Sequence, residues 1–226
     1  MTRAERAQTL LERFPKMYPE AHCELLHANP LELLVATMLS AQCTDRRVNI
    51  VTRTLFSQCR SVRDYAEIPQ EELEELIRST GFFRMKSRNI RAMAAALLAR
   101  HQGQVPATLE ELAALPGVGR KTANVVLGNA FGINAGVVVD THVGRVSRRL
   151  DLTRHASPEK VENDLARLFP QKLWTDLSHW LIWHGRRRCM ARNPDCPHCE
   201  FNDFCPRIGV ARKEPARFAP PRQIPV

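Results

Sequence analysis

The architecture of this chain follows from one short stretch, Leu115-Pro116-Gly117-Val118-Gly119-Arg120-Lys121-Thr122-Ala123-Asn124. Two glycines one residue apart allow a tight turn and a close approach of the backbone to a ligand. The apolar residues that follow predict a helix that ends at Gly132. We therefore expect Gly117 and Gly119 to direct backbone N–H groups outward at a helix N-terminus, a ready site for an anion such as phosphate. Lys121 belongs to the first turn of that helix.

Two nucleotide-binding motifs also place glycines before a helix, and neither fits this stretch. A P-loop requires Gly-Lys-Ser/Thr, but here Arg120 stands between the glycine and Lys121-Thr122. A dinucleotide-binding fingerprint requires a preceding strand and a third glycine, whereas residues 109–115 have a helical pattern. The arrangement that fits is helix, hairpin, helix, with the hairpin on a nucleic-acid backbone.

Composition favours an intracellular protein with a polyanionic partner. The 226 residues include 33 Lys and Arg against 24 Asp and Glu, a net charge of +9, although a solvated basic surface would give the same balance. We find no apolar run of membrane-spanning length and no signal-peptide core at the N-terminus. We therefore expect a cytoplasmic location, and in that reducing environment the seven cysteines indicate metal binding rather than disulfides.

Helical periodicity and helix-capping residues occur along nearly the whole chain, so we predict an all-α protein. Beyond the helix after Gly119, helices are expected to start at Pro30, after Thr44, at Pro69, at Ser87, after Thr108, after Asp140, after Ser157 and at Leu173. The strand-like run 137–139 is interpreted as an extended connection. Residues 207–226 are rich in Arg, Lys and Pro, which predicts a disordered basic tail.

Four cysteines near the C-terminus are spaced C-x6-C-x2-C-x5-C, at Cys189, Cys196, Cys199 and Cys205. Four thiolates this close can complete a tetrahedral ligand set for a [4Fe–4S] cluster or for zinc. Zinc sites usually pair two C-x2-C knuckles, and only one short spacing occurs here. Spacing alone favours the iron–sulfur cluster without excluding zinc.

Three features now occur together and in order along the chain. They are residues 115–123, the block Val139-Asp140-Thr141-His142-Val143-Gly144-Arg145-Val146, and the four-cysteine loop. This combination closely resembles the endonuclease III family, the iron–sulfur helix-hairpin-helix DNA glycosylases. The resemblance covers roughly residues 3–206 and is highly specific.

The resemblance implies two helical domains with DNA in the cleft between them. A six-helix barrel with the helix-hairpin-helix would cover residues 23–134, and residues 1–22 and 135–206 would form a domain with a [4Fe–4S] cluster on the four cysteines. The implied partner is double-stranded DNA that contains oxidised pyrimidines or abasic sites. The implied reaction is removal of the damaged base followed by strand cleavage through β-elimination, and we expect a monomer.

The same resemblance implies the roles of individual residues. Lys121 matches the nucleophile that attacks C1′ and forms a Schiff base with the opened sugar. Only the neutral amine attacks, and we expect the helix N-terminus and partial burial to lower the pKa of Lys121. Asp140 would activate this lysine and stabilise the cationic sugar, although its position also suits a plain helix N-cap. Without the match to Asp140, a phosphate-neutralising cation would be the more common role for this lysine.

DNA contacts are implied for seven residues: Gln42, Phe82, Gly117, Val118, Gly119, Arg120 and His142. Gln42 lies where the family inserts an amide into the hole left by the extruded nucleotide. Phe82 lies where it inserts a wedge into the neighbouring base step. The wedge is usually aliphatic, so Phe82 departs from the family pattern. His142 is interpreted as a contact to phosphate or to the pocket, with an interior structural histidine as the alternative.

Two other functions remain open from the sequence. Adenine mismatch glycosylases share the hairpin, the aspartate and the cluster, but they lack the lysine and carry a further C-terminal domain. A non-catalytic DNA-binding module would use the hairpin and the cluster for docking alone. Only Lys121 and Asp140 argue against this second alternative.

Overall fold

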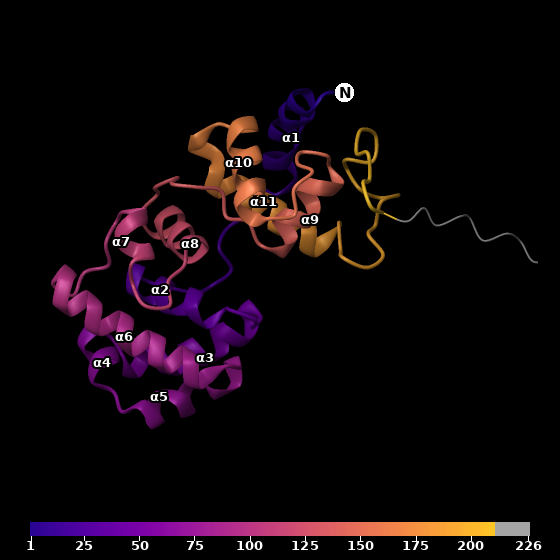
Figure 1. Cartoon of the computed structure of the whole chain (residues 1–226). Coiled ribbons are helices and arrows are strands. Elements are labelled where there is room, and N and C mark those ends of the chain that lie inside the picture. The colour runs from indigo at the N-terminus through magenta and orange to yellow at the C-terminus, as the bar shows by residue number, and fades with distance from the viewer. Residues whose placement is uncertain (211–226) are drawn as a thin grey trace, which may run out of the picture.

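The structure is a computed structural model that describes residues 1–210 (Figure 1). Within this range the fold is helical and contains no strand, as the sequence predicts, and residues 137–139 form an extended connection. Most of the predicted tail, residues 211–226, lies outside the described residues. No helix in the described range is long and apolar enough to cross a membrane.

The elements follow one another along the chain without a long insertion. They are α1 Arg3–Met17, α2 Pro30–Leu39, α3 Asp45–Gln58, α4 Val62–Glu67, α5 Gln70–Ile77, the 3-10 helix η1 Arg78–Thr80, α6 Phe83–His101, α7 Leu109–Ala113, α8 Arg120–Ala130, α9 Thr141–Arg149, α10 Pro158–Leu168, the 3-10 helix η2 Gln171–Leu173 and α11 Trp174–Arg187.

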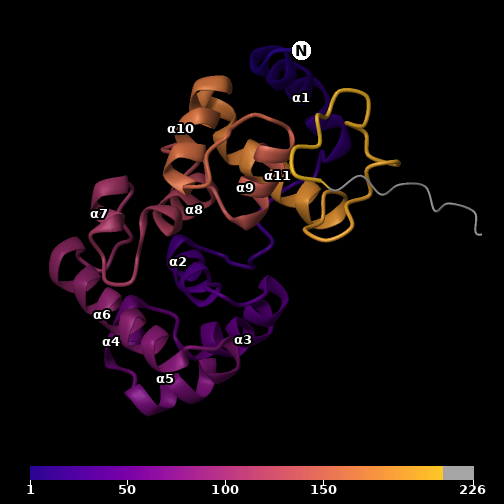
Figure 2. The ribbon, with the colours of Figure 1, turned by 45° about the vertical axis from the view of Figure 1, so that its right-hand side comes forward.

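Two separate hydrophobic cores divide the helices into two domains. Helices α2 to α8 share the first core, and α1 packs with α9, α10 and α11 around the second (Figures 1 and 2). The N-terminal helix therefore joins the C-terminal part of the chain across most of the sequence. The arrangement agrees with two helical domains, whereas the exact boundaries stay a prediction.

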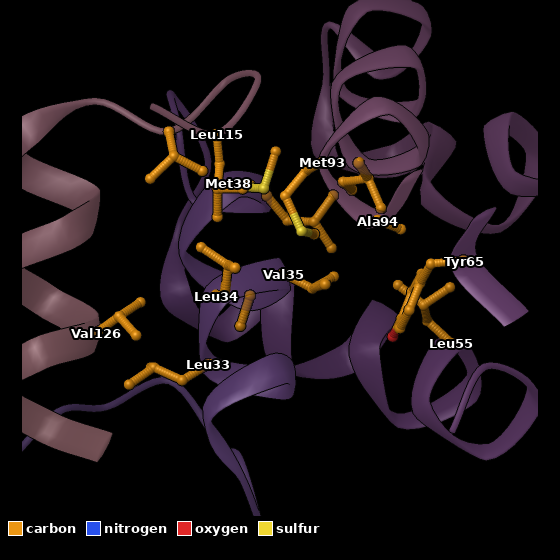
Figure 3. Close-up of a cluster of buried hydrophobic side chains, with 14 of the residues drawn as sticks. Leu33, Leu34, Val35, Met38, Leu55, Tyr65, Met93, Ala94, Leu115 and Val126 are labelled. Atoms are coloured by element: carbon orange, nitrogen blue, oxygen red, sulfur yellow. The ribbon is translucent and has the colours of Figure 1, made fainter. Parts of the chain in front are cut away.

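Helix α2 forms the centre of the first domain. Every residue from Leu33 to Leu39 is buried, and a helix that is apolar on all sides needs neighbours on all sides. Figure 3 shows Leu34, Val35 and Met38 of this helix between side chains of the surrounding helices, with Val126 of α8 facing it.

The second core is dominated by aromatic rings. Phe14 of α1 is fully buried, stacks on Trp180 of α11 at a centroid distance of 5.9 Å and meets Phe201 edge-on at 5.0 Å. Phe201 belongs to the cysteine loop, which has no helix of its own in the described range. Aromatic packing of this kind is worth about 0.5–1.5 kcal/mol per pair beyond the area buried. It anchors the cysteine loop to the helices of the second domain.

Helix α8 lies between the two domains in both views (Figures 1 and 2). Its buried residues Ala123, Val126 and Leu127 belong to the first core. Another face contacts the second domain at Gly128, where an added Cβ would overlap the hydroxyl of Thr175 and lie 3.0 Å from its Cγ2. The glycine therefore permits a close approach of α8 to the start of α11.

The predicted helix positions agree with the structure, with three differences. Helix α6 begins at Phe83, before the predicted Ser87, because Phe82 takes a left-handed conformation that the sequence does not reveal. Helix α4 was not predicted because it is only one and a half turns long, and Ser61 caps it through a capping box. At Thr108 the hydroxyl donates to the carboxylate of Glu111, so only half of the expected capping box forms.

We expect Gly128→Ala to destabilise the fold by about 1–3 kcal/mol, because the added methyl group overpacks the contact with Thr175. Thr175 cannot turn away freely, since its hydroxyl donates to Asn134 at 2.7 Å. Urea unfolding would measure the loss. Gly144→Ala in α9 is the matched control, because its Cβ would meet only Val139 at 3.9 Å; it should be neutral or slightly stabilising. Equal stability of the two variants would contradict the close α8–α11 contact.

Candidate active site and metal centre

The hairpin between α7 and α8 has the turn that its glycines predict. Gly117 has φ +73°, and a Cβ there would lie 2.7 Å from the Cβ of Asn89, so both the backbone and the space require glycine. The N–H of Val118 donates to the carbonyl of Leu115 at 3.1 Å, and the Val118 side chain is buried in the first core. Val118 can therefore offer only its backbone to a partner.

Gly119 is the N-cap of α8 and supplies no side-chain cap. The N–H groups of Gly119, Arg120 and Lys121 donate no backbone hydrogen bond within the described chain. Nothing described lies within 4 Å of a Cβ placed on Gly119, so a ligand can approach the backbone here. Free N–H groups at a helix start bind anions. The predicted phosphate site is therefore present in its geometry.

Arg120, predicted as a DNA contact, pairs with a carboxylate of the second domain. Its Nε and Nη2 donate to the Oε2 and Oε1 of Glu162 at 3.1 and 2.9 Å. Glu162 is almost fully buried, and its Oε1 also lies 3.4 Å from the amide nitrogen of Asn124. In this structure the guanidinium thus joins α8 to α10, with about half of the side chain still exposed.

Lys121 and Asp140 line the same pocket, which lies between the domains and has a volume of about 110 Å³. This is far more than the roughly 10–15 Å³ that one water requires on the same scale. Asp140 is the N-cap of α9, and its Oδ1 accepts from the N–H of Val143 at 2.8 Å. The N-cap fixes the carboxylate at the pocket wall. Lys121 is exposed rather than partly buried, because its place in the first turn of α8 puts it at the pocket mouth.

The two residues predicted to enter the duplex both have left-handed backbone conformations. Gln42 has φ +54° and Phe82 has φ +49°, and both are exposed. Such conformations are uncommon outside glycine and, for non-glycine residues, cost on the order of 1–3 kcal/mol. Phe82 is 59% exposed, a high value for an aromatic side chain. Strained, exposed loop tips of this kind are typical of functional positions.

Lys86 connects these two loops from inside the protein. Its side chain is buried, and its Nζ donates to the carbonyls of Leu39 at 2.7 Å and Thr80 at 2.8 Å. Leu39 ends α2, three residues before Gln42, and Thr80 ends η1, two residues before Phe82. One ammonium group therefore holds the bases of both strained loops. This role was not predicted from the sequence, where the available signal is a lysine within the apolar pattern of α6.

A group of ion pairs closes one side of the pocket between the domains. Arg186 of α11 contacts the carboxylates of Glu24 and Asp45, the latter at 2.7 Å, and all three line the pocket. The guanidinium of Arg187 lies over the ring of Trp183, 3.5 Å from its centroid. It is also 3.7 Å from the carboxylate of Glu24. The sequence analysis did not find this contact, because its partners lie more than a hundred positions apart.

His142 lies beside the pocket on α9. Its Nδ1 is 3.1 Å from Nη2 of Arg145, and its ring packs against Gly185 of α11. Burial lowers the pKa of His142 below its ordinary value. The contacts described for this ring are made within the second domain.

The four C-terminal cysteines line one common pocket with His184, Arg149 and Arg188. All four are free and partly buried. Arg149 holds the loop by donating to the carbonyl of Met190 at 2.7 Å and that of Ala191 at 3.0 Å, and its Nη1 lies 3.3 Å from the Sγ of Cys189. The buried Arg149 thus supports a loop that lacks regular secondary structure.

The donor set suits a metal centre. Burial is the largest cause that raises the pKa of Cys199, to about 11, and the charges of Cys205 and Cys189 raise it further. A bound cation would remove this mutual repulsion, because it deprotonates a coordinating thiol outright. His184, Cys199 and Glu200 also lie close enough to share an ion. However, this group offers only three ligand atoms and its Glu200 is paired with Arg188, whereas four thiols complete a ligand set, so the four thiols are the better donors.

A hairpin with free N–H groups beside a pocket that holds an amine and a carboxylate defines a class of protein, the helix-hairpin-helix enzymes that repair DNA bases. Residues 35–171 match the model of the HhH-GPD superfamily of base excision DNA repair proteins.

Individual relatives narrow this class. Endonuclease III of Synechocystis sp. is 49% identical over 91% of this chain and 94% of its own length, and endonuclease III of Bacillus subtilis is 45% identical over 91% and 94%. A solved non-covalent endonuclease III–DNA complex matches with a TM-score of 0.87 and 48% identity over 91% of this chain and 96% of that one. A trapped endonuclease III–DNA covalent intermediate matches equally well, at 0.87 and 47%. The chain belongs to the endonuclease III family and is a bifunctional DNA glycosylase and AP lyase of base excision repair.

We expect Lys86→Met to lower the free energy of unfolding by about 1–3 kcal/mol, because it leaves the buried carbonyls of Leu39 and Thr80 without a donor. Denaturant unfolding followed by circular dichroism would measure this. Lys160→Met, on the exposed face of α10, is the matched control and should change stability by less than about 0.5 kcal/mol. If both variants unfolded at the wild-type midpoint, Lys86 would not support the two loops.

Proposed function

We propose that this chain excises oxidised pyrimidines from duplex DNA and then cleaves the abasic site through a Schiff base on Lys121. The observation that carries the proposal is the shared pocket of Lys121 and Asp140 beside the hairpin. A base inside a duplex cannot be reached, so the nucleotide must first be extruded into this pocket. Oxidative damage weakens stacking, which lowers the cost of extrusion.

Lys121 acts as the nucleophile in this proposal. Its neutral amine attacks C1′, the N-glycosidic bond breaks, and the base departs with the bonding electrons and a proton. The C1′–O4′ bond then breaks, O4′ takes a proton, and the opened sugar is linked to Nζ as an iminium ion. Loss of a proton from C2′ and departure of the 3′ phosphate break the strand by β-elimination. Asp140, fixed by its N-cap bond to Val143, receives the proton of the lysine and stabilises the cationic sugar.

The remaining predicted residues hold the DNA in the cleft between the domains. Gly117 and Gly119 offer their backbone N–H groups to a phosphate, Val118 between them closes the turn through its bond to Leu115, and Arg120 adds a positive charge. Gln42 fills the place of the extruded nucleotide, and Phe82 enters the adjacent base step. His142 contributes at the edge of the pocket. The strained, exposed conformations of Gln42 and Phe82 support this assignment.

The proposal includes a [4Fe–4S] cluster on Cys189, Cys196, Cys199 and Cys205. Thiolate ligation by four cysteines is the usual way in which such clusters are held. When bound, the cluster would cross-link the four-cysteine loop, which lacks regular secondary structure. The shared pocket of the four free thiols supports the assignment.

The domain boundaries at residues 23–134 and at 1–22 with 135–206, a monomeric state and a cytoplasmic location are also part of the proposal. The two separate hydrophobic cores support the boundaries. The free state of all seven cysteines is consistent with a reducing compartment.

We expect wild-type protein to form a covalent adduct with an abasic or oxidised-pyrimidine duplex when sodium borohydride is present, because the hydride reduces the iminium ion on Lys121. Lys121→Met removes the amine and should abolish the adduct, whereas Lys172→Met, an exposed lysine of η2, should form it as the wild type does. Denaturing gel electrophoresis would measure the adduct. A wild-type protein without adduct on either substrate would fit a non-catalytic DNA-binding module and would refute the proposal.

We expect the purified protein to be brown and to contain iron and acid-labile sulfide in equal amounts. Cys196→Ser should lose most of both, because it removes one of four thiolate ligands. Cys43→Ser is the matched control: Cys43 is partly buried beside the first core, and its substitution should leave the iron content unchanged. Iron and sulfide assays on the three proteins measure this. A colourless protein with one zinc per chain would show that the cysteines bind zinc instead.

A further inference from the structure

The pocket of Lys121 and Asp140 has a third polar wall, formed by His179 of α11 and Asn129 of α8. The Nε2 of His179 lies 2.7 Å from the Oδ1 of Asn129. Asn129 stands two turns after Lys121 on the same helix, so this contact ties the helix of the amine to the opposite wall of the pocket.

The proton positions on this pair follow from a second hydrogen bond. The Nδ2 of Asn129 donates to the carbonyl of Val125 at 2.8 Å, so its Oδ1 must be the atom that faces His179. An oxygen accepts, and therefore Nε2 of His179 carries the hydrogen. Burial, with a smaller contribution from the charge of His22, lowers the pKa of His179 to about 4, so the ring is neutral near pH 7. Its Nδ1 is consequently a bare acceptor.

This acceptor is open to the pocket. In the part of the chain that the structure describes, Nδ1 of His179 has no hydrogen-bond partner. The atom is nevertheless accessible to solvent. Because His179 lines the pocket, the free lone pair is available to a molecule that enters it.

Three hydroxyl groups that line the same pocket are already committed as donors. Thr37 donates to the carbonyl of Leu33 at 2.7 Å, Ser40 to that of Thr37 at 2.8 Å and Ser178 to that of Trp174 at 2.7 Å. All three line the pocket, and none can donate to a base without losing an internal bond. Nδ1 of His179 is thus a side-chain acceptor that suits a base edge with an N–H group.

We propose that His179 is a specificity-determining residue whose Nδ1 accepts the N3–H of the extruded base, so that the pocket favours lesions of uracil and thymine over lesions of cytosine. The inference rests on the proposed function, since it requires the base to enter this pocket. Uracil and thymine derivatives carry a hydrogen on N3, whereas cytosine derivatives carry a lone pair there. Two lone pairs would then face each other, and buried polar groups left unpaired are the strongest source of discrimination between similar substrates. The amino group of cytosine is on C4, one ring position away from N3. In a base held at C1′ it therefore does not point at Nδ1 of His179.

Two duplexes that differ only at this edge test the inference, one with a single 5-hydroxyuracil and one with a single 5-hydroxycytosine. Base release by full-length wild-type protein under single-turnover conditions should be faster on 5-hydroxyuracil. His179→Phe should lower the rate on 5-hydroxyuracil about tenfold, as expected for one lost hydrogen bond, and should change the rate on 5-hydroxycytosine much less. His179→Asn, which restores an acceptor near the position of Nδ1, should recover part of the preference.

Cleavage of a duplex with a preformed abasic site is the internal control, because this substrate has no base to read. His155→Phe, a half-exposed histidine outside the pocket, should cleave it at the wild-type rate and keep the wild-type preference, whereas His179→Phe should lose less on it than on 5-hydroxyuracil. With His179→Phe, an equal loss on both lesions, or an equal loss on 5-hydroxyuracil and abasic DNA, would show that His179 only supports the pocket and would overturn the inference. Failure of wild-type protein to cleave abasic DNA is a distinguishable result, since it refutes the proposed function itself.

Discussion

The packing of α8 between two hydrophobic cores is the constraint on which the site depends. Residues three or four positions apart lie on the same face of a helix, so α8 presents separate rows of side chains to the first core, to the second domain and to the pocket. Ala123, Val126 and Leu127 belong to the first core. The row Arg120, Asn124 and Gly128 contacts Glu162 and Thr175 of the second domain, and the row Lys121, Val125 and Asn129 lines the pocket. The position of the amine is thus fixed by contacts of both domains with the helix that carries it.

The parts of the structure that the sequence predicts are those with a local physical cause. Gly117 and Gly119 predict the hairpin because its turn and its close approaches require glycine, and Asp140 predicts a helix start because an N-cap needs only the next three residues. The spacing of four cysteines predicts a shared site for the same reason. Contacts between distant positions were not readable. Arg186 with Asp45 and Arg120 with Glu162 each join segments whose proximity only the fold creates.

The strained backbone conformations of Gln42 and Phe82 have a common support in Lys86. Gln42 and Phe82 keep left-handed conformations that an unsupported loop would relax, and each lies directly after a segment whose carbonyl is held by Lys86. A buried ammonium is itself costly, so its retention here is consistent with the need to fix both loops relative to each other. At Phe82 the proposed wedge is an exposed aromatic ring. A larger, flat side chain favours stacking on a base over simple filling of space.

In the proposed site, the residues for catalysis and the residue for base recognition lie on different parts of the helices. Lys121 and Asp140 stand at helix starts, where free N–H groups and a fixed N-cap favour work on phosphate, sugar and charge. His179 lies within α11, where burial keeps its ring neutral and Asn129 fixes its hydrogen. A neutral, oriented acceptor can distinguish an N–H from a lone pair, because it bonds the first and is repelled by the second. In the proposed mechanism, chemistry common to all lesions depends on the helix starts, and discrimination between lesions depends on the side chain of His179.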